Sequence, residues 1–187
     1  MQTIVEILAD ADHRMKGALD ATTDEFRHIR TGRANPMLVD GIMVDYYGTP
    51  TPLSQIGNVS APEPRLLVIT PWDKSMLNPI SKAILNSELS LNPSNDGQVI
   101  RLVLPPLTED RRKEFARMAS KKAEDGKIAV RNVRRDAIEH LKRLEKEKLA
   151  GEDDVKRAHD KIQKITDDFI SKIDAAHDTK VEEIMEV

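Results

Sequence analysis

The sequence predicts an α+β protein in which a small mixed domain is inserted into a three-helix bundle. Three long stretches repeat apolar residues at spacings of three and four, which is typical of amphipathic helices. One stretch precedes residues 31–105 and two follow them, whereas residues 31–105 themselves alternate short apolar runs with turns. Because each amphipathic helix has one apolar face to bury, the three are expected to pack against one another.

The first helix is predicted to begin at a capping box and to reach about Arg30. Thr3 can cap the helix, and Glu6 stands three residues later, as a capping box requires. Gly32 and Pro36 are expected to end it, because neither residue favours a helix. Its apolar stripe consists of Ile4, Leu8, Ala11, Met15, Leu19, Thr22, Phe26 and Ile29.

The beginning of the inserted domain predicts strands. Ile42, Val44 and Tyr46 alternate with polar or smaller residues, which is typical of a half-buried strand. The segment GTPTP at 48–52 predicts a turn, since glycine and proline interrupt regular structure. The segment RLLVIT at 65–70 is rich in branched apolar residues and predicts a second strand.

The rest of the inserted domain predicts a short helix and a closing strand. Ser75 can cap that helix, and Pro79 is tolerated only near its first turn. Trp72 precedes the helix and is interpreted as a packing anchor. Residues 95–97, with the sequence Asn-Asp-Gly, predict a turn, and residues 99–104 predict a closing strand.

The second long helix is predicted to run from Thr108 to about Lys148, and the third to begin at Glu152. Thr108 is a good cap residue, and acidic residues in a first turn favour a helix start. Gly126 is the weak point of the second helix because glycine has low helix propensity, and Gly151 is expected to end it. The third helix is expected to bury Val155, Ile162, Ile165, Phe169, Ile173, Ala176 and Ile184.

The insertion divides the chain into two predicted domains. Residues 1–30 and 106–187 form the bundle domain, and residues 31–105 form the inserted domain. Two short connections join them, and a pair of short connections favours a mobile hinge. Proline stiffens such a connection and glycine gives it freedom. The candidate hinge residues are Gly32, Pro36, Pro105 and Pro106.

Composition excludes several classes of site. The chain has no cysteine, which excludes disulfides and thiolate chemistry and fits a reducing cytoplasm. Its five histidines form no HExxH motif or i,i+4 pair, and neither a phosphate-binding GxxxxGK[ST] loop nor a GxSxG motif is present. We therefore expect no enzyme activity, metal or cofactor. No apolar run reaches membrane length, and no signal peptide is visible, so no membrane partner is expected.

The clearest functional pattern is VRNVRRD at 130–136, within the second long helix. Its valines continue an apolar stripe, and its arginines fall on a neighbouring stripe. Neither Arg131 nor Arg134 has a carboxylate three or four residues away, so neither is expected to have a carboxylate partner on its own helix, which favours an external anion. Phosphate matches the guanidinium fork, although carboxylates on a neighbouring helix could complete the pairs instead. The basic stripe consists of Lys127, Arg131, Arg134, Arg135 and Lys142.

The charge distribution agrees with a local basic surface. The net charge of the chain is −3, but residues 106–148 carry a net +5 and residues 149–187 a net −5. Local basic clustering, and not the total charge, indicates nucleic-acid binding. Pairing of the two helices with each other explains part of this asymmetry, but not the arginines beside the apolar face.

Five sequence segments carry a resemblance to a known family. They are IRTGRANP at 29–36, DGIMVDYYGTPTPL at 40–53, LNPSNDG at 91–97, LPPLTEDRRKE at 104–114 and VRNVRRDA at 130–137. In this order and spacing they resemble the bacterial-type ribosome recycling factor family, and the resemblance covers nearly the whole chain. It implies an L-shaped protein, with a three-helix bundle and a hinged β/α/β domain. It also implies a protein that is not an enzyme and has no cofactor.

The resemblance also implies a function and the residues that perform it. The family binds the post-termination ribosome and, with elongation factor G and GTP, splits it into subunits, the GTP being hydrolysed by the elongation factor. By resemblance, Arg131 and Arg134 contact large-subunit ribosomal RNA, with Arg135 beside them. The resemblance implies Arg30 and Arg33 as further phosphate contacts. The small domain is then expected to act as a lever that faces the elongation factor, in a cytoplasmic, monomeric protein.

Other interpretations of the same patterns remain. A helical RNA-binding or chaperone-like module would use the same basic stripe without an elongation factor. A self-associating coiled coil is disfavoured because strict heptads are not sustained. An organellar form is disfavoured because no transit segment precedes the first residue.

Overall fold

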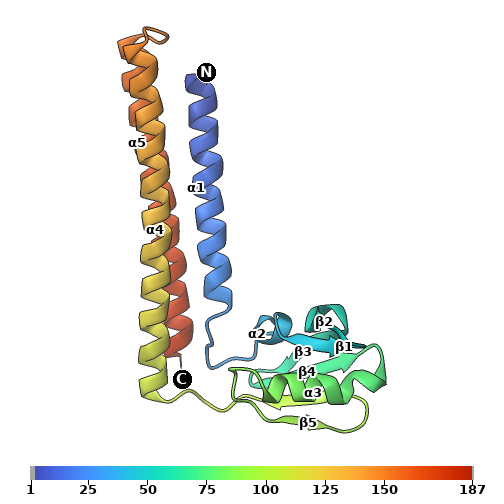
Figure 1. The fold of residues 1–187 in the computed structure, drawn as a ribbon. Helices are drawn as coiled ribbons and strands as arrows, with labels where there is room; N and C mark the ends of the chain where they lie inside the picture. The colour runs from blue at the N-terminus through green and yellow to red at the C-terminus, as the bar shows by residue number, and fades with distance from the viewer. Residues whose placement is uncertain (1–2, 187) are drawn as a thin grey trace. The chain divides into compact units, whose positions relative to one another are not determined.

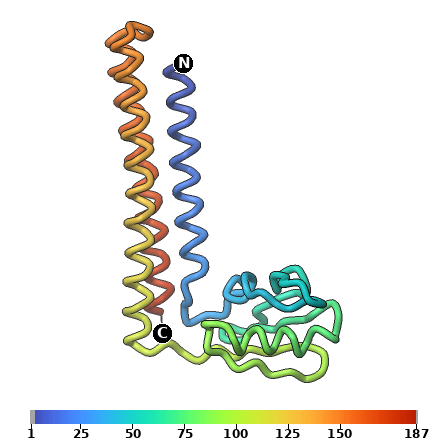
Figure 2. The backbone as a smooth tube through the Cα atoms, in the orientation of Figure 1, coloured from blue at the N-terminus to red at the C-terminus, as the bar shows by residue number. Residues whose placement is uncertain are grey.

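A computed structural model of the chain describes residues 3–186 and confirms the predicted α+β class (Figures 1 and 2). The structure divides into two compact units. The bundle unit contains the described residues up to Arg27 and Ala116–Glu182. The mixed unit contains His28–Phe115 and the described residues from Glu183 onward. Each unit has its own buried core.

The bundle unit is built from the predicted long helices, which run alongside one another (Figure 1). They are α1 (Ile4–Arg27), α4 (Glu109–Lys146) and α5 (Glu152–Met185). The first residues of α4 and the last of α5 belong to the mixed unit. The predicted apolar stripes supply most of the core, as burial of one face per helix requires. Its largest fully buried side chains are Met15, Leu141, Ile162 and Ile173.

The start of α1 and the end of α4 have defined hydrogen bonds. The capping box is confirmed, because Thr3 N donates to Glu6 Oε2 at 2.7 Å and Glu6 N donates to Thr3 Oγ1 at 3.3 Å. The prediction that Gly151 ends α4 is wrong. The chain turns earlier, at Lys148, whose φ is 56°. Leu149 N donates to Leu144 O at 2.9 Å, as in a Schellman motif, which satisfies a carbonyl of the last turn.

The mixed unit contains a four-stranded antiparallel sheet in the order β3-β4-β6-β5 and a separate β1–β2 hairpin. The predicted strands at 65–70 and 99–104 correspond to the neighbouring strands β4 and β6, and the predicted helix after Ser75 corresponds to α3. The elements are α2 (Met37–Asp40), β1 (Met43–Tyr46), β2 (Thr49–Pro52), η1 (Leu53–Gln55), β3 (Gly57–Glu63), β4 (Leu66–Pro71), η2 (Lys74–Met76), α3 (Leu77–Leu85), β5 (Pro93–Asn95) and β6 (Ile100–Val103).

The structure corrects the prediction of a turn at 48–52. The turn lies at Tyr47 and Gly48, whose φ angles are 49° and 86°. The residues from Thr49 to Pro52 continue as β2 and pair with β1. Prolines are tolerated there because β2 belongs to a two-stranded hairpin. One edge of β2 therefore pairs with no strand, and backbone N–H groups on that edge are not needed for hydrogen bonds within the sheet. Asp45 stabilises the turn by accepting a hydrogen bond from Gly48 N at 2.7 Å.

Two further predictions next to α3 are wrong. Asp73, and not Ser75, caps the helical segment, since Asp73 Oδ1 accepts a hydrogen bond from Ser75 N at 2.9 Å. Trp72 is not a packing anchor, because 71% of it is exposed. It follows the last buried residue of β4, Pro71, so the alternation of the strand directs its side chain to solvent.

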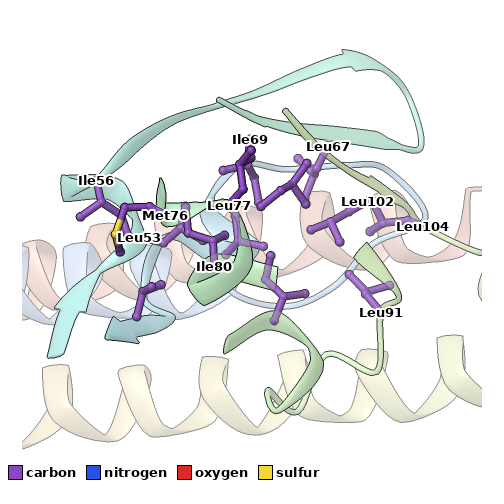
Figure 3. Close-up of a cluster of buried hydrophobic side chains, with 14 residues drawn as sticks. Leu53, Ile56, Leu67, Ile69, Met76, Leu77, Ile80, Leu91, Leu102 and Leu104 are labelled. Carbon is purple, nitrogen blue, oxygen red and sulfur yellow. The ribbon is translucent and has the colours of Figure 1, made fainter. Parts of the chain in front are cut away.

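The core of the mixed unit consists of aliphatic side chains and one methionine (Figure 3). On β6, Ile100 and Leu102 point into this core while Arg101 between them is exposed, as a half-buried strand requires. Among the described residues, no aromatic ring belongs to this buried cluster, which agrees with the low aromatic content of the sequence. The buried cluster is Val39, Val44, Leu53, Ile56, Leu67, Ile69, Met76, Leu77, Ile80, Ile84, Leu91, Ile100, Leu102 and Leu104.

Candidate nucleic-acid interface

Helix α4 positions the basic stripe by burying the apolar stripe beside it. All the predicted apolar positions from Val130 to Leu144 are buried. Their burial fixes the rotation of α4 about its axis, so that the arginines of VRNVRRD lie at the boundary of the buried face. Arg131 and Arg134 are half-buried there, and Arg135 is exposed. The sequence pattern therefore predicts the face on which these cations lie.

Gly126 fixes the position of α4 relative to α1. The residue is buried inside an unbroken helix, so it is not the weak point that its helix propensity predicts. A Cβ atom added there would lie 2.1 Å from Oγ1 and 3.1 Å from Cβ of Thr22 on α1. Only glycine allows this close approach of the two helices without displacing Thr22. The basic stripe begins with the next residue, Lys127.

Carboxylates of the same chain already pair with Lys127 and Arg131. Arg131 Nη1 lies 3.1 Å from Oε1 of Glu124, seven residues earlier on α4. Lys127 Nζ lies 3.0 Å from Oδ1 of Asp174 on α5 and 3.5 Å from Oε2 of Glu124. The prediction that Arg131 has no carboxylate partner on its own helix is wrong, because two long side chains can meet across two turns. For Lys127, a neighbouring helix does supply a carboxylate.

Arg134 and Arg135 have different surroundings. Arg134 Nη1 lies 3.5 Å from Oε1 of Gln163 on α5, which is a weak hydrogen bond to a neutral amide. Within residues 3–186, Arg134 has no carboxylate partner. Arg135 forms neither a hydrogen bond nor an ion pair with the described part of the chain. The charges of these two arginines are therefore left without an anionic partner from the described residues.

Electrostatics keep Glu124 ionised. The hydrogen bond from Arg131 is the main cause that lowers the pKa of Glu124, and the charge of Lys127 acts in the same direction. The hydrogen bond to Asp174 is the main cause that raises the pKa of Lys127. Both shifts favour the charged forms of the two groups. This part of the basic surface therefore carries its own counter-charges.

The other candidate phosphate contacts, Arg30 and Arg33, belong to the mixed unit. Arg30 Nη2 donates to Pro105 O at 3.0 Å, and its Nε is buried without a partner among the described residues. Burial, followed by repulsion from Arg111, lowers the pKa of Arg30. Arg33 is mostly exposed, and its Nη2 lies 2.9 Å from Oε1 of Glu186. Arg30 thus donates a hydrogen bond to a backbone carbonyl of the same chain, whereas the side chain of Arg33 is exposed to solvent.

The candidate hinge residues also lie in the mixed unit. Gly32 has open space where a Cβ would be, and its φ is not positive. Pro36 directly precedes α2, and Pro105 accepts the hydrogen bond from Arg30. That bond joins Arg30, the last residue of the first predicted bundle segment, to Pro105 of the candidate hinge.

Sequence reasoning missed the partners of the basic stripe. Glu124, Gln163 and Asp174 face it, yet none was identified as part of the site. A search that included carboxylates two helical turns away would have found Glu124. The residues on α5 could not be assigned, because they depend on how α5 packs against α4.

Within residues 3–186, no group of three or more His, Asp and Glu side chains lies close enough to hold a metal ion. None of the described helices is both long and apolar enough to cross a membrane.

Comparison with known proteins gives matches over the full length of the chain. A family model described as ribosome recycling factor matches residues 22–185. A protein of Clostridioides difficile (strain 630), named ribosome-recycling factor, is 55% identical over 183 residues, which are 98% of this chain and 99% of that protein.

Solved structures agree with these matches. A solution structure of a ribosome recycling factor has 42% identity and a TM-score of 0.79, and it covers 100% of both chains. A second structure has 45% identity and a TM-score of 0.69 over 99% of this chain and 100% of that chain. Its description is of models for the T. thermophilus ribosome recycling factor and the E. coli elongation factor G bound to the E. coli post-termination complex.

Proposed function

Because this chain belongs to the ribosome recycling factor family, we propose that it recycles ribosomes after termination. It binds the post-termination ribosome and, with elongation factor G and GTP, splits it into subunits, releasing mRNA and tRNA for new initiation. The observation that carries this proposal is the coverage of the matches, which extend over both units of the fold. A relative described on the post-termination complex together with elongation factor G supports the same partners.

The basic stripe of α4 is the proposed contact with large-subunit ribosomal RNA. Arg131, Arg134 and Arg135 offer guanidinium forks, which match phosphate geometry. Lys127 adds a cation at the start of the stripe. Since a rigid helix presents these groups in a row, the contacts recognise the RNA backbone and its shape, and not base edges. Arg30 and Arg33 are proposed as additional phosphate contacts, with Arg33 the more accessible of the two.

The chain contributes binding and movement to this reaction, and no chemistry of its own. In this proposal it is neither an enzyme nor a user of cofactors, and the elongation factor hydrolyses GTP. The sequence contains no phosphate-binding glycine loop of the GxxxxGK[ST] type, which supports that division of labour. A cytoplasmic location follows from a ribosomal partner.

The domain organisation gives the proposed movement. Residues 1–30 and 106–187 hold the RNA, and residues 31–105 act as a lever on which the elongation factor pushes. Gly32, Pro36, Pro105 and Pro106 set the range of the swing in this proposal. The glycine at position 32 supports it, because glycine restricts backbone rotation less than any other residue.

Light scattering of post-termination ribosomes tests this function directly. The ribosomes are mixed with the protein, elongation factor G and GTP, and an initiation factor holds the free subunits apart. A fall in scattering that requires protein, elongation factor and GTP together is expected. Binding by co-sedimentation without any fall in scattering would contradict recycling, and it would leave an RNA-binding module that meets ribosomes without splitting them.

A further inference from the structure

Glu124 lies among the cations of the basic stripe and is bound to two of them. Its Oε1 lies 3.1 Å from Nη1 of Arg131, and its Oε2 lies 3.5 Å from Nζ of Lys127. A single carboxylate therefore directs one oxygen at each of two proposed RNA contacts. An RNA phosphate would present oxygens to the same two groups.

The two cations depend on Glu124 to different degrees. Lys127 also pairs with Asp174 on α5, at 3.0 Å, so it keeps a carboxylate partner when Glu124 moves away. Arg131 has no other hydrogen bond or ion pair within the described residues. Loss of Glu124 would therefore free the guanidinium of Arg131 and leave Lys127 neutralised.

The pair is accessible, so a ligand can displace it. The side chain of Glu124 is 53% exposed and that of Arg131 is 38% exposed. Exposed pairs of this kind are weak, because water screens them and two long side chains must be held in place. RNA binding can therefore exchange the carboxylate for a phosphate without disturbing the core.

We propose that Glu124 is an intramolecular competitor that limits how tightly Arg131 binds RNA phosphate. This inference rests on the proposed function, in which Arg131 contacts ribosomal RNA. Binding requires the carboxylate to leave Arg131, and the displaced carboxylate then lies close to the phosphate that replaced it. Both effects weaken binding, which suits a factor that must leave the ribosome after each round.

The test is Glu124→Gln, which removes the charge and keeps the size and the helix propensity of the side chain. We expect the dissociation constant for ribosomes to fall by about two- to fivefold, which is the range expected for losing one exposed ion pair. The dependence of log affinity on log salt should steepen by up to about 0.7–0.9. Asp10→Asn is the matched control, because it removes one carboxylate from α1 while Arg14 keeps Asp136 at 2.7 Å.

Arg131→Ala, alone and combined with Glu124→Gln, separates the inference from the proposed function. In the Arg131→Ala background, Glu124→Gln should change affinity no more than the Asp10→Asn control does. Weaker binding of Glu124→Gln alone would make Glu124 a positioning residue and overturn the competition. An equal gain in both backgrounds, or no gain in either, would also overturn it while leaving the RNA contact intact. If Arg131→Ala alone bound ribosomes with unchanged affinity, the proposed contact of Arg131 with RNA would be wrong. The proposed competition by Glu124 would then be wrong as well.

Discussion

Arg131 and Arg134 are the proposed RNA contacts whose loss should change both the affinity for ribosomes and its dependence on salt. We expect the double substitution to alanine to weaken ribosome binding with little loss of folding, because both side chains lie at the edge of the buried face of α4. Each lost phosphate contact should reduce the salt slope by about 0.7–0.9 log units per log unit of salt. Affinity measured over a series of salt concentrations provides the check.

The control for that experiment is Arg157→Ala. Arg157 is an exposed arginine on α5 that pairs with Asp154 and lies outside the basic stripe. Removing it lowers the positive charge of the bundle unit by the same amount as one stripe arginine. If the double variant kept the affinity and the slope of the control, the assignment of RNA contacts to the stripe would be wrong.

Adding a single methyl group at Gly126 is predicted to change the stability of the protein. In an exposed helix, Gly→Ala stabilises by about 1 kcal/mol. Here the added Cβ would lie 2.1 Å from Oγ1 of Thr22, so the Thr22 side chain or the two helices must shift. We expect Gly126→Ala to lower the free energy of unfolding by about 1–2 kcal/mol, as overpacking of a core does. Thermal or urea unfolding measures the change.

A matched glycine and a compensating variant make this prediction specific. Gly17 lies on the exposed side of α1, and a Cβ there would meet nothing within 4 Å, so Gly17→Ala should stabilise by about 0.5–1 kcal/mol. Thr22→Ala should rescue part of the loss in Gly126→Ala, since it removes the Oγ1 and Cγ2 atoms that the new methyl group meets. Equal stabilisation by both glycine substitutions would show that the helices do not approach closely at this point.

At the scale of elements, the turn between β5 and β6 gives the clearest pH dependence. The carboxylate of Asp96 accepts hydrogen bonds from Val99 N at 2.9 Å, Gln98 N at 2.9 Å and Arg101 Nη1 at 2.6 Å. These bonds, that from Val99 first, lower the pKa of Asp96 below its usual value of 3.8. A lowered pKa in the folded state means that the ionised form contributes stability above the pKa of the unfolded chain, and that this contribution is lost in acid.

Asp96→Asn tests whether ionised Asp96 stabilises the folded protein at neutral pH and loses this effect in acid. The wild-type protein should be more stable than the variant at neutral pH, and the difference should shrink as the pH falls below the ordinary Asp value of 3.8. Urea unfolding at a series of pH values measures the difference. A difference that stays constant to the acid end of the series would mean that the geometry of the turn, and not the charge of Asp96, provides the stability.

The helices could be predicted from the sequence, whereas parts of the sheet could not. An apolar stripe of α4 from Val130 to Leu144 is a long periodic pattern, and all of its positions are buried. In contrast, β3 has one half-buried valine and mainly exposed residues, so its alternation is too weak to detect. The short strand β5 likewise presents only polar residues and proline. These strands are defined by their pairing with the neighbouring strands β4 and β6, and not by a pattern of their own.

The candidate site shows the same limit. The face of Arg131 follows from local periodicity, and the sequence therefore predicts it. Its partner Glu124 is on the same helix but outside the usual i±4 range, and Asp174 near Lys127 comes from another helix. Trp72 is exposed although most tryptophans contribute to packing. Buried and exposed residues alternate at the end of β4, and Trp72 directly follows the buried Pro71. Partners set by tertiary packing cannot be obtained from one helix alone.

At the scale of the whole molecule, the lever proposal separates binding from splitting. Proline at position 32 fixes φ near −65° and also restricts the residue before it, Thr31. Gly32→Pro should therefore bind post-termination ribosomes with nearly normal affinity, because the basic stripe lies in the other unit. It should fail to split them in the presence of elongation factor G and GTP, as measured by light scattering.

Gly32→Ala is the control that isolates backbone freedom from side-chain size. A Cβ at Gly32 meets no atom within 4 Å and the φ there is not positive, so alanine fits without strain. Alanine should retain splitting, and both variants should have the circular dichroism of the wild type. If the proline variant splits ribosomes as fast as the alanine variant, rotation at Gly32 is not part of the mechanism. Loss of binding and splitting together in the proline variant would show instead that Gly32 shapes the bound conformation, which also contradicts a pure lever.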